Sequence, residues 1–292
     1  MMKSFQVSVI VPVFNAEHFV VQAVESAVVL EEVGEVILVE DGSPDNALER
    51  CRELTLKYNN VKLYRHPDGQ SKGPGASRNL GIENSSFDFI AFLDADDWYL
   101  PNRFKMDREV FMDHPEAEGV YNATGFYYEE SKHLDLAKLT TFRERVSPQK
   151  LAVSLLRGNK GNFTTNAITL KRNLIDRAGG FSEKLQLHQD THMWIRCAVH
   201  GAIFPSELEV PVAVRRVHKN NRIVHRNTDS HNLYYRFLYL SLREAKISDK
   251  ELFNLAFRIH FGSKSNNRLI RYALGAWELL KRPGVILKLF KQ

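Results

Sequence analysis

The sequence predicts an α/β protein in which a mostly parallel central sheet is flanked by helices. Two observations lead to this fold class. Short apolar segments rich in β-branched and aromatic residues alternate with longer stretches of helical periodicity through the first hundred residues. A polar or glycine-rich break follows each apolar segment. Strands that alternate with helices pair in parallel, and nearly all-apolar strands suit a sheet that is covered on both faces.

The same patterns place the individual elements. We expect strands at residues 7–13, 36–39, 61–66 and 89–93. Helices are expected at residues 16–30, 44–58 and 75–83, because their apolar residues recur at helical spacing. Ser43 is the expected N-cap of the second helix, with Pro44 at its first position. Pro12 lacks a backbone N–H, so we expect the sheet ladder to end near it.

Length and composition indicate an ordinary folded protein. The chain has 292 residues, of which 43% are hydrophobic and 26% charged, enough for one large domain or a domain with an appendage. Its two cysteines fit a reducing compartment, and its first residues resemble a strand more than a signal peptide. Apolar runs stay short of the roughly 18 residues that span a bilayer. We therefore expect a cytoplasmic protein.

Charge is distributed unevenly along the chain. Residues 215–292 contain 17 Lys and Arg against 5 Asp and Glu, whereas the preceding residues are acidic. Within this basic tail, residues 231–292 are expected to form amphipathic helices. They would pack on the rest of the protein or on a second subunit, or they would bind the surface of an anionic membrane. No known nucleic-acid-binding motif occurs, so we expect no nucleic acid partner.

Acidic residues follow two of the expected strands. Glu40 and Asp41 follow the second strand, while Asp94, Asp96 and Asp97 follow the fourth. The carboxyl ends of parallel strands meet at one edge of the sheet, where ligands of such folds bind. Carboxylates separated by one residue suit Mg²⁺ or Mn²⁺, which would also offset the repulsion between them. This edge is therefore the predicted binding site.

Six motifs in order make the sequence similar to a known family. They are SVIVPVFN, VEDGSPDN, GPGASRNLGI, FLDADDWYLPNRF, GGFSEKL and HQDTHMWIRCA. Together they resemble the family 2 glycosyltransferases, the inverting enzymes with the GT-A fold, over residues 8–218. The resemblance implies a GT-A catalytic domain at residues 1–220, with a nucleotide-sugar half at about 1–105 and an acceptor half at about 106–220. Residues 221–292 would form a C-terminal helical extension.

The resemblance also assigns residues to the nucleotide. Pro12 and Phe14 would line the base pocket, with Phe14 stacked on the base, and Asp41 would bind the base. Arg78 would lie along the nucleotide. Asp94 would bind the ribose or the metal ion.

Further residues are assigned to the metal ion and to catalysis. Asp96 would be the main ligand of Mn²⁺ or Mg²⁺, and His218 is a candidate metal ligand or diphosphate contact. Asp190 would be the catalytic base. Before it stands Gln189, where the family usually has Glu, so the residue that orients the acceptor or the base is changed. The Gln-x-x-Arg-Trp segment typical of polymerising members is missing, which favours the addition of a single sugar.

The function implied is inverting transfer of a sugar from a nucleotide-diphosphate sugar, with a UDP-sugar favoured. The acceptor would be a glycan or a lipid-linked hydroxyl in the biosynthesis of a cell-surface glycan or polysaccharide. Two alternatives stay open. Gln189 motivates a catalytically impaired relative that binds nucleotide-sugars or glycans, and Asp94 could be the nucleophile of a phosphotransferase, although its place after the fourth strand disfavours this.

Overall fold

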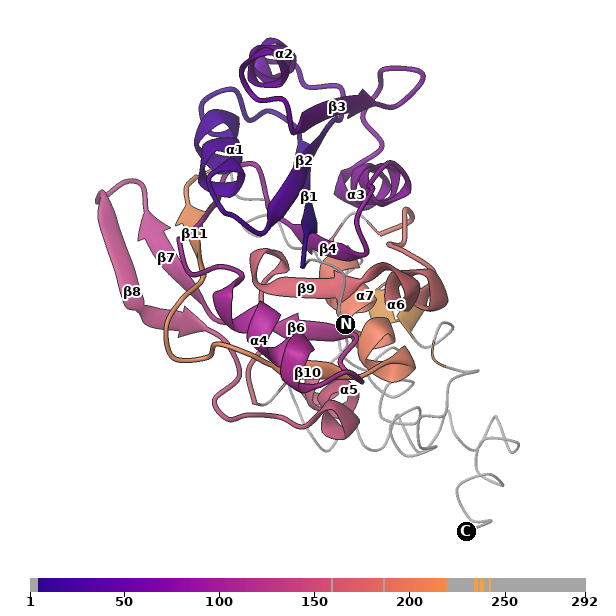
Figure 1. The fold of residues 1–292 in the computed structure, drawn as a ribbon. Coiled ribbons are helices and arrows are strands. Elements are labelled where there is room, and N and C mark those ends of the chain that lie inside the picture. The colour runs from indigo at the N-terminus through magenta and orange to yellow at the C-terminus, as the bar shows by residue number, and fades with distance from the viewer. Residues whose placement is uncertain are drawn as a thin grey trace, which may run out of the picture. The chain divides into compact units, whose positions relative to one another are not determined.

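The computed structural model describes residues 5–158, 160–185 and 187–219, together with residues 234, 235, 237, 238 and 242 (Figure 1). The chain divides into two compact units, Met1–Val224 and His225–Gln292. Every named helix and strand belongs to the first unit. The expected helices at 231–292 lie almost entirely outside the described residues, so the helical extension and its membrane contact stay predictions. Within the part of the chain that is described, no helix is both long enough and apolar enough to cross a membrane.

A mostly parallel sheet organises the first unit. Among the described residues, seven strands form it in the order β10-β6-β9-β4-β1-β2-β3. The predicted strands are β1 (Val7–Val13), β2 (Val33–Glu40), β3 (Val61–Arg65) and β4 (Phe89–Phe92), all parallel to their neighbours in this group. Next to β4, the strand β9 (Ile168–Lys171) runs antiparallel to β4 and to β6 (Gly119–Tyr121), and β10 (Ile203–Pro205) runs parallel to β6. The predicted fold class is confirmed.

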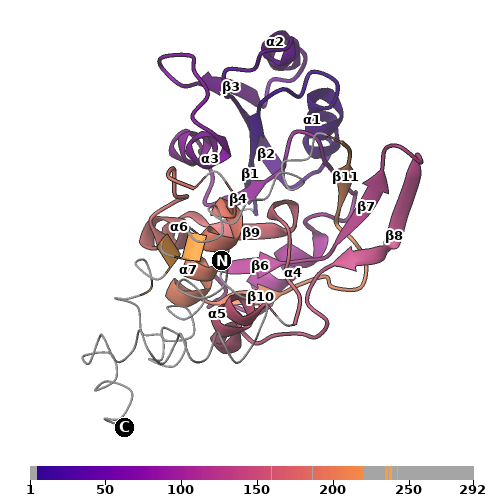
Figure 2. The same cartoon turned by 180° about the vertical axis from the view of Figure 1, so that it is seen from behind.

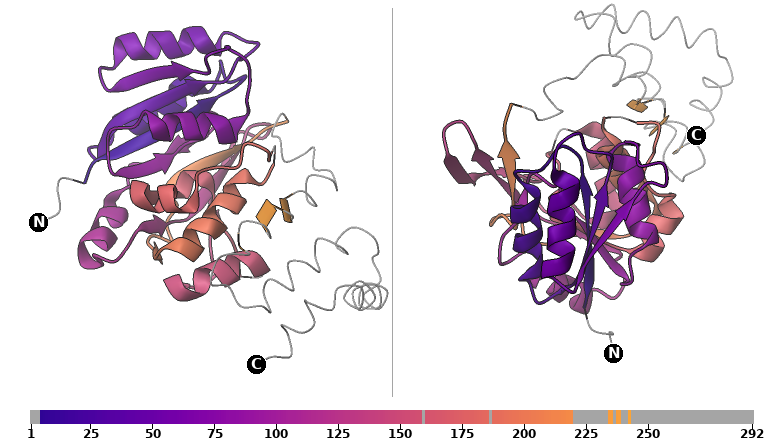
Figure 3. Two further views of the ribbon diagram at one scale, coloured as in Figure 1. Left: turned by 90° about the vertical axis from the view of Figure 1, so that its right-hand side faces the viewer. Right: turned by 90° about the horizontal axis from the view of Figure 1, so that it is seen from above.

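Helices cover both faces of this sheet. In Figure 1, α1 (Val20–Val28) and α2 (Ala47–Lys57) lie on one side of β1 and β2, and α3 (Pro74–Glu83) lies on the other. A turned view shows the helices stacked against the layer of strands (Figure 3, left). The other helices are α4 (Lys105–Asp113), α5 (Pro148–Arg157), α6 (Arg172–Ala178) and α7 (Gln189–His200), with a 3-10 turn, η1, at Thr165–Ala167.

The described residues also form a smaller sheet of four strands beside the first (Figure 2). Its order is β5-β11-β7-β8, and its strands are β5 (Trp98–Tyr99), β11 (Ala213–Val217), β7 (Thr124–Tyr128) and β8 (His133–Thr140). Strands β7 and β8 form an antiparallel pair, and the sequence patterns did not identify either of them.

The start of α2 differs from the prediction for a local reason. The helix begins at Ala47, with Asn46 before it, instead of at Pro44. Ser43 is already engaged where β1 and β2 end, since its N–H donates to Glu40 Oε1 at 2.5 Å and its Oγ accepts from Asn15 N at 3.2 Å. The Asp45 side chain takes the place of Ser43 at the start of the helix, because its Oδ1 accepts from Ala47 N at 3.1 Å. The chain therefore completes the strand-end turn before the helix starts.

Pro12 lies inside β1, so the ladder ends near it on one side only. Toward β2 the pairing continues to Val13, whose carbonyl accepts from Asp41 N at 2.8 Å. Toward β4 it stops at Ile10, whose carbonyl accepts from Leu93 N at 3.0 Å. Successive residues of a central strand direct their backbone N–H and C=O groups to opposite neighbouring strands. Pro12 therefore directs its backbone groups toward β4, as Ile10 does. The missing N–H of proline therefore falls where the ladder toward β4 has already ended.

Candidate active site

The predicted site residues gather at the carboxyl ends of β1, β2 and β4. These strands are adjacent and parallel, so their ends share one edge of the sheet. The backbone beyond β1 is joined to the turn beyond β2 by the Asn15–Ser43 hydrogen bond. Phe14 stands at this edge with 39% of its surface exposed. Part of the surface of this aromatic residue is therefore accessible at the sheet edge.

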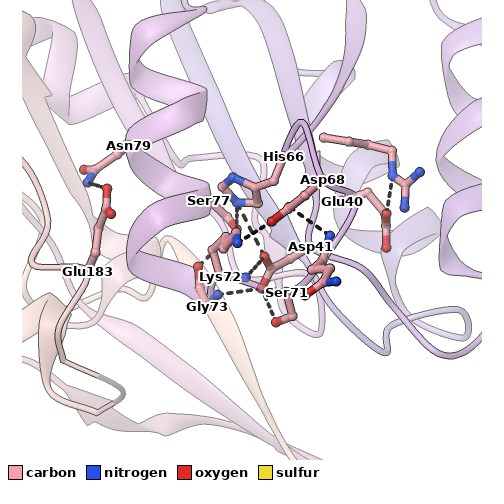
Figure 4. Close-up of polar contacts among 12 residues, drawn as sticks. Glu40, Asp41, His66, Asp68, Ser71, Lys72, Gly73, Ser77, Asn79 and Glu183 are labelled. Atoms are coloured by element: carbon pink, nitrogen blue, oxygen red, sulfur yellow. Dashed lines mark hydrogen bonds and ion pairs between the residues drawn. The ribbon is translucent and has the colours of Figure 1, made fainter.

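Asp41 is buried at the end of β2 and holds the segment before α3 in place. Its Oδ1 accepts from Lys72 N at 2.7 Å, and its Oδ2 accepts from Gly73 N at 2.9 Å and from Ser71 Oγ at 2.8 Å. His66 Nε2 lies 3.4 Å from Oδ1, and Figure 4 shows the cluster. The carboxylate thus has a structural role that the sequence did not reveal. Its contact with a base stays a prediction. The two carboxylate oxygens can accept a further hydrogen bond from a base besides the three they already accept.

Arg78 and Asp94 form an ion pair between α3 and the end of β4. Arg78 Nη2 donates to Asp94 Oδ1 at 2.6 Å, and the guanidinium lies over the Phe181 ring at 5.4 Å. Arg78 is buried, and its Nε has no hydrogen-bond partner within the described structure. The pair brings together two residues that the resemblance assigned to the nucleotide.

Asp96 meets His218, which follows β11. The separation between Asp96 Oδ2 and His218 Nε2 is 2.9 Å. Two ligands at right angles around Mg²⁺, each at 2.0–2.1 Å, are about 3 Å apart, so this pair fits two adjacent ligands of one cation. No cluster of three or more His, Cys, Asp or Glu side chains placed to hold a metal ion is found among the described residues. The two side chains suit a cation that takes its other ligands from water and phosphate oxygens, as Mg²⁺ usually does.

The carboxylates at this edge repel one another. The Asp94 side chain is 36% exposed, and its partial burial raises the pKa of the carboxyl group. The charges of Asp96 and Asp190 raise it further, while Arg78 opposes the shift. Burial likewise raises the pKa of Asp97 well above its ordinary value, with Asp96 and Asp94 adding to the effect. A divalent cation at this edge would relieve the repulsion, so the residues present fit one.

Asp97 faces away from the edge and binds two other segments. Its Oδ2 accepts from Asn166 Nδ2 at 2.5 Å, and its Oδ1 accepts from Arg216 N at 2.7 Å. Sequence reasoning missed both partners, which lie 69 and 119 residues further along the chain. The only signal for them was the third acid itself, because a buried carboxylate must find donors.

Asp190 lies in the first turn of α7. Its charge raises the pKa of Asp94, so it belongs to the same group of carboxylates. Its Oδ1 accepts from Thr191 N at 2.7 Å. The helix dipole places a partial positive charge at this end of α7. Gln189 before it is buried near Gly75, so the altered residue packs beneath the start of α3.

Hydrogen bonds join the segment before α7 to α3. The Asn79 side chain accepts from Phe181 N at 2.8 Å and donates to Phe181 O at 3.0 Å. It also donates to Glu183 Oε1 at 3.2 Å (Figure 4). Arg196 of α7 donates to the carbonyl of Gly180. These contacts link the helix that carries Arg78 to the helix that carries Asp190.

Together, the fold and the site define an α/β protein with a candidate nucleotide and cation site at the carboxyl edge of its parallel sheet. Residues 8–182 match the model of glycosyl transferase family 2. The chain belongs to this family, and the predicted glycosyltransferase is confirmed at that level. Asp190 and His218 lie beyond the matched residues.

Individual relatives agree with the family. An uncharacterized glycosyltransferase of Rickettsia felis is 28% identical over 206 residues, which are 68% of this chain and 31% of that protein. The poly(ribitol-phosphate) beta-glucosyltransferase of Bacillus spizizenii is 29% identical over 178 residues, 55% of this chain and 27% of that protein. The chain thus spans about a third or less of the length of these two relatives.

Solved structures agree on the fold. The crystal structure of S. aureus TarS 1-349 in complex with UDP-GlcNAc superimposes with a TM-score of 0.68 at 19% identity, covering 90% of this chain and 74% of that one. At this identity the likeness concerns the fold alone, and it confirms the GT-A prediction.

Proposed function

We propose that this chain is an inverting glycosyltransferase that moves one sugar from a UDP-sugar to a hydroxyl group of a cell-surface glycan. The observation that carries the proposal is the convergence of Asp94, Asp96 and Asp190 at one sheet edge, with Arg78 and His218 as their partners. This set offers a place for a diphosphate with its cation and a carboxylate for the acceptor. Family membership supports it.

The donor would lie across the ends of β1, β2 and β4. Phe14 is exposed enough to stack on a base, and Asp41 is rigid because three donors hold its carboxylate. Pro12 would close the base pocket from β1. Uracil is favoured as the base because the structural neighbour TarS was crystallised with UDP and with UDP-GlcNAc. Arg78 would hold Asp94 in place beside the ribose.

A divalent cation, Mn²⁺ or Mg²⁺, would be held by Asp96 and His218. When bound, it would supply several kcal/mol of charge stabilisation to the diphosphate leaving group. Family 2 enzymes with this fold generally use such an ion.

Asp190 would act as the general base. Its carboxylate would take the proton of the acceptor hydroxyl while the acceptor oxygen forms a bond to the anomeric carbon and the bond from that carbon to the diphosphate oxygen breaks. Asp190 also fits this role because it lies in the first turn of α7, where the partial positive charge of the helix end attracts a carboxylate. A single displacement inverts the anomeric centre, so an α-linked donor would give a β-linked product.

The acceptor would be a surface polymer of the bacterial cell wall type. Two relatives support this class: the Bacillus spizizenii protein named above and the minor teichoic acid biosynthesis protein GgaA of Bacillus subtilis, 34% identical over 114 residues. These residues are 36% of this chain and 25% of GgaA, so the polymer is proposed by class only.

The proposal can be tested by incubating the chain with UDP-sugars, Mn²⁺ and poly(ribitol phosphate). Release of UDP and an NMR spectrum of the product would report turnover and anomeric configuration. We expect UDP release with at least one UDP-sugar and inversion at the anomeric carbon. Retention would contradict the single displacement, and nucleotide-sugar binding without turnover would favour the impaired relative that Gln189 suggests.

A further inference from the structure

The acidic turn after β4 contains a third carboxylate that neither faces the sheet edge nor takes part in the proposed reaction. Asp97 is 4% exposed. Both of its oxygens accept hydrogen bonds from protein donors, Arg216 N at 2.7 Å and Asn166 Nδ2 at 2.5 Å. A carboxylate in this position holds neighbouring segments of the protein together instead of contacting a ligand.

The bond from Asn166 continues into the turn itself. Asn166 lies in η1 and is buried, and its Oδ1 accepts from Asp94 N at 2.9 Å. Asp97 N in turn donates to Asp94 O at 3.0 Å. Asp94, Asp97 and Asn166 therefore form a closed ring of hydrogen bonds that determines where the Asp94 backbone lies.

The bond from Arg216 continues into β11. Besides the bond from its backbone N–H, Arg216 donates from Nε to Asp96 O at 3.0 Å. Its guanidinium is held over the rings of Phe19 and Trp98, at 4.9 and 5.1 Å. His218 follows two residues later and meets Asp96 Oδ2 at 2.9 Å. The register of β11 against the turn thus determines how His218 faces Asp96.

We propose that Asp97 is a positioning residue that places Asp94, Asp96 and His218 relative to one another for the cation and the diphosphate, by joining the acidic turn to η1 and to β11. The inference rests on the proposed function. Partners of this kind behind metal ligands typically change metal affinity by about 10- to 100-fold when they are lost.

The pattern of donors makes the proposal testable by exchanging two side chains. In Asp97→Asn, an NH₂ group replaces one of the two accepting oxygens. This NH₂ group must then face another donor, either Arg216 N–H or Asn166 Nδ2, and one hydrogen bond is lost. Rotating the Asn166 amide only moves the conflict to Asp94 N–H. Adding Asn166→Asp removes the conflict, because residue 97 then donates to residue 166, which still accepts from Asp94 N. Net charge and the number of hydrogen bonds are conserved.

The experiment is calorimetric titration of UDP with Mn²⁺ on the wild type, Asp97→Asn and the exchange variant. We expect the single variant to bind about 10- to 100-fold more weakly and the exchange variant to recover most of that loss. A structural defect elsewhere would not be repaired by the second substitution. If Asp97 were itself a ligand, moving its charge to residue 166 would not restore binding.

Glu35→Gln is the matched control. Glu35 is buried at the start of β2, and it also accepts from a backbone N–H and a side chain, Ser86 N at 2.5 Å and Ser8 Oγ at 2.6 Å. Glu35→Gln is the same change from carboxylate to amide, but it lies at the opposite end of β2 from Asp41 and the sheet edge. We therefore expect UDP binding to be unchanged.

The outcomes separate this inference from the proposed function. A wild type that binds no nucleotide would overturn both. A wild type that binds, with Asp97→Asn binding equally well, would overturn the positioning role alone. Should Asp97→Asn not fold, the exchange variant decides, because a folded exchange variant with weak binding would contradict the proposal and wild-type binding would support it.

Discussion

Replacing Asp190 with asparagine is expected to lower sugar transfer by about 10² to 10⁴ fold while UDP still binds. Asparagine has nearly the same shape and can still accept from Thr191 N through its carbonyl oxygen, so α7 should start as before. The amide cannot accept the acceptor's proton. The loss should therefore appear in kcat, and the affinity for UDP with Mn²⁺ should stay near that of the wild type.

Initial rates of UDP release and calorimetric titration of UDP together check this expectation. Glu49→Gln is a suitable control, because Glu49 is also an acid in the first turn of a helix, α2, but is exposed and pairs with Arg52. We expect it to leave transfer unchanged. If Asp190→Asn transferred sugar at the wild-type rate, another group would have to be the base.

Replacing Arg103 with methionine is expected to lower the free energy of unfolding by about 3–5 kcal/mol, because it leaves a buried carboxylate without its cation. Arg103 and Asp107 are both 0% exposed, and Arg103 Nη1 lies 2.8 Å from Asp107 Oδ2. Arg103 also donates from Nε to Asn166 O at 2.9 Å and from Nη2 to Ile168 O at 2.9 Å. Methionine fills similar space but satisfies none of these acceptors.

Urea denaturation followed by circular dichroism measures this loss. The control is Arg50→Met, which breaks an exposed pair with Glu53 on α2 and should change stability far less than Arg103→Met. Equal stability of the two variants would show that the Arg103 pair contributes no more than a surface one. Because Arg103 holds the carbonyl of Asn166, we also expect weaker UDP binding wherever Arg103→Met remains folded.

The parallel half of the fold was predictable because its signals are local. Residues 7–13 and 89–93 are apolar runs that end in polar turns, and such runs need no distant partner to be identified as strands. The start of α2 was not predictable, because Ser43 has two uses and the turn after β2 takes precedence over the helix cap. The β7–β8 pair was missed since its exposed strand, β8, lacks a strong alternation of apolar residues.

For the candidate site as well, local signals were predictable and contacts between distant residues were not. Asp94, Asp96 and Asp190 follow from motifs, and the structure brings them within electrostatic reach of one another. The bonds made by Asp97 join residues that are far apart in sequence, and no local pattern reports such a pairing. Asp41 illustrates the same limit, because its three donors lie 30 to 32 residues further along the chain and no local pattern pairs them with Asp41.

The most direct test of the account is calorimetric titration of UDP into the wild type and Asp96→Ala, each with Mn²⁺ and with chelator. We expect the wild type to bind UDP only when Mn²⁺ is present, and the variant to lose that binding because one of the two proposed ligands is gone. GDP in the same titration would report base selectivity. Binding of UDP that is equal with chelator and unaffected by Asp96→Ala would contradict a nucleotide and cation site at this edge of the sheet.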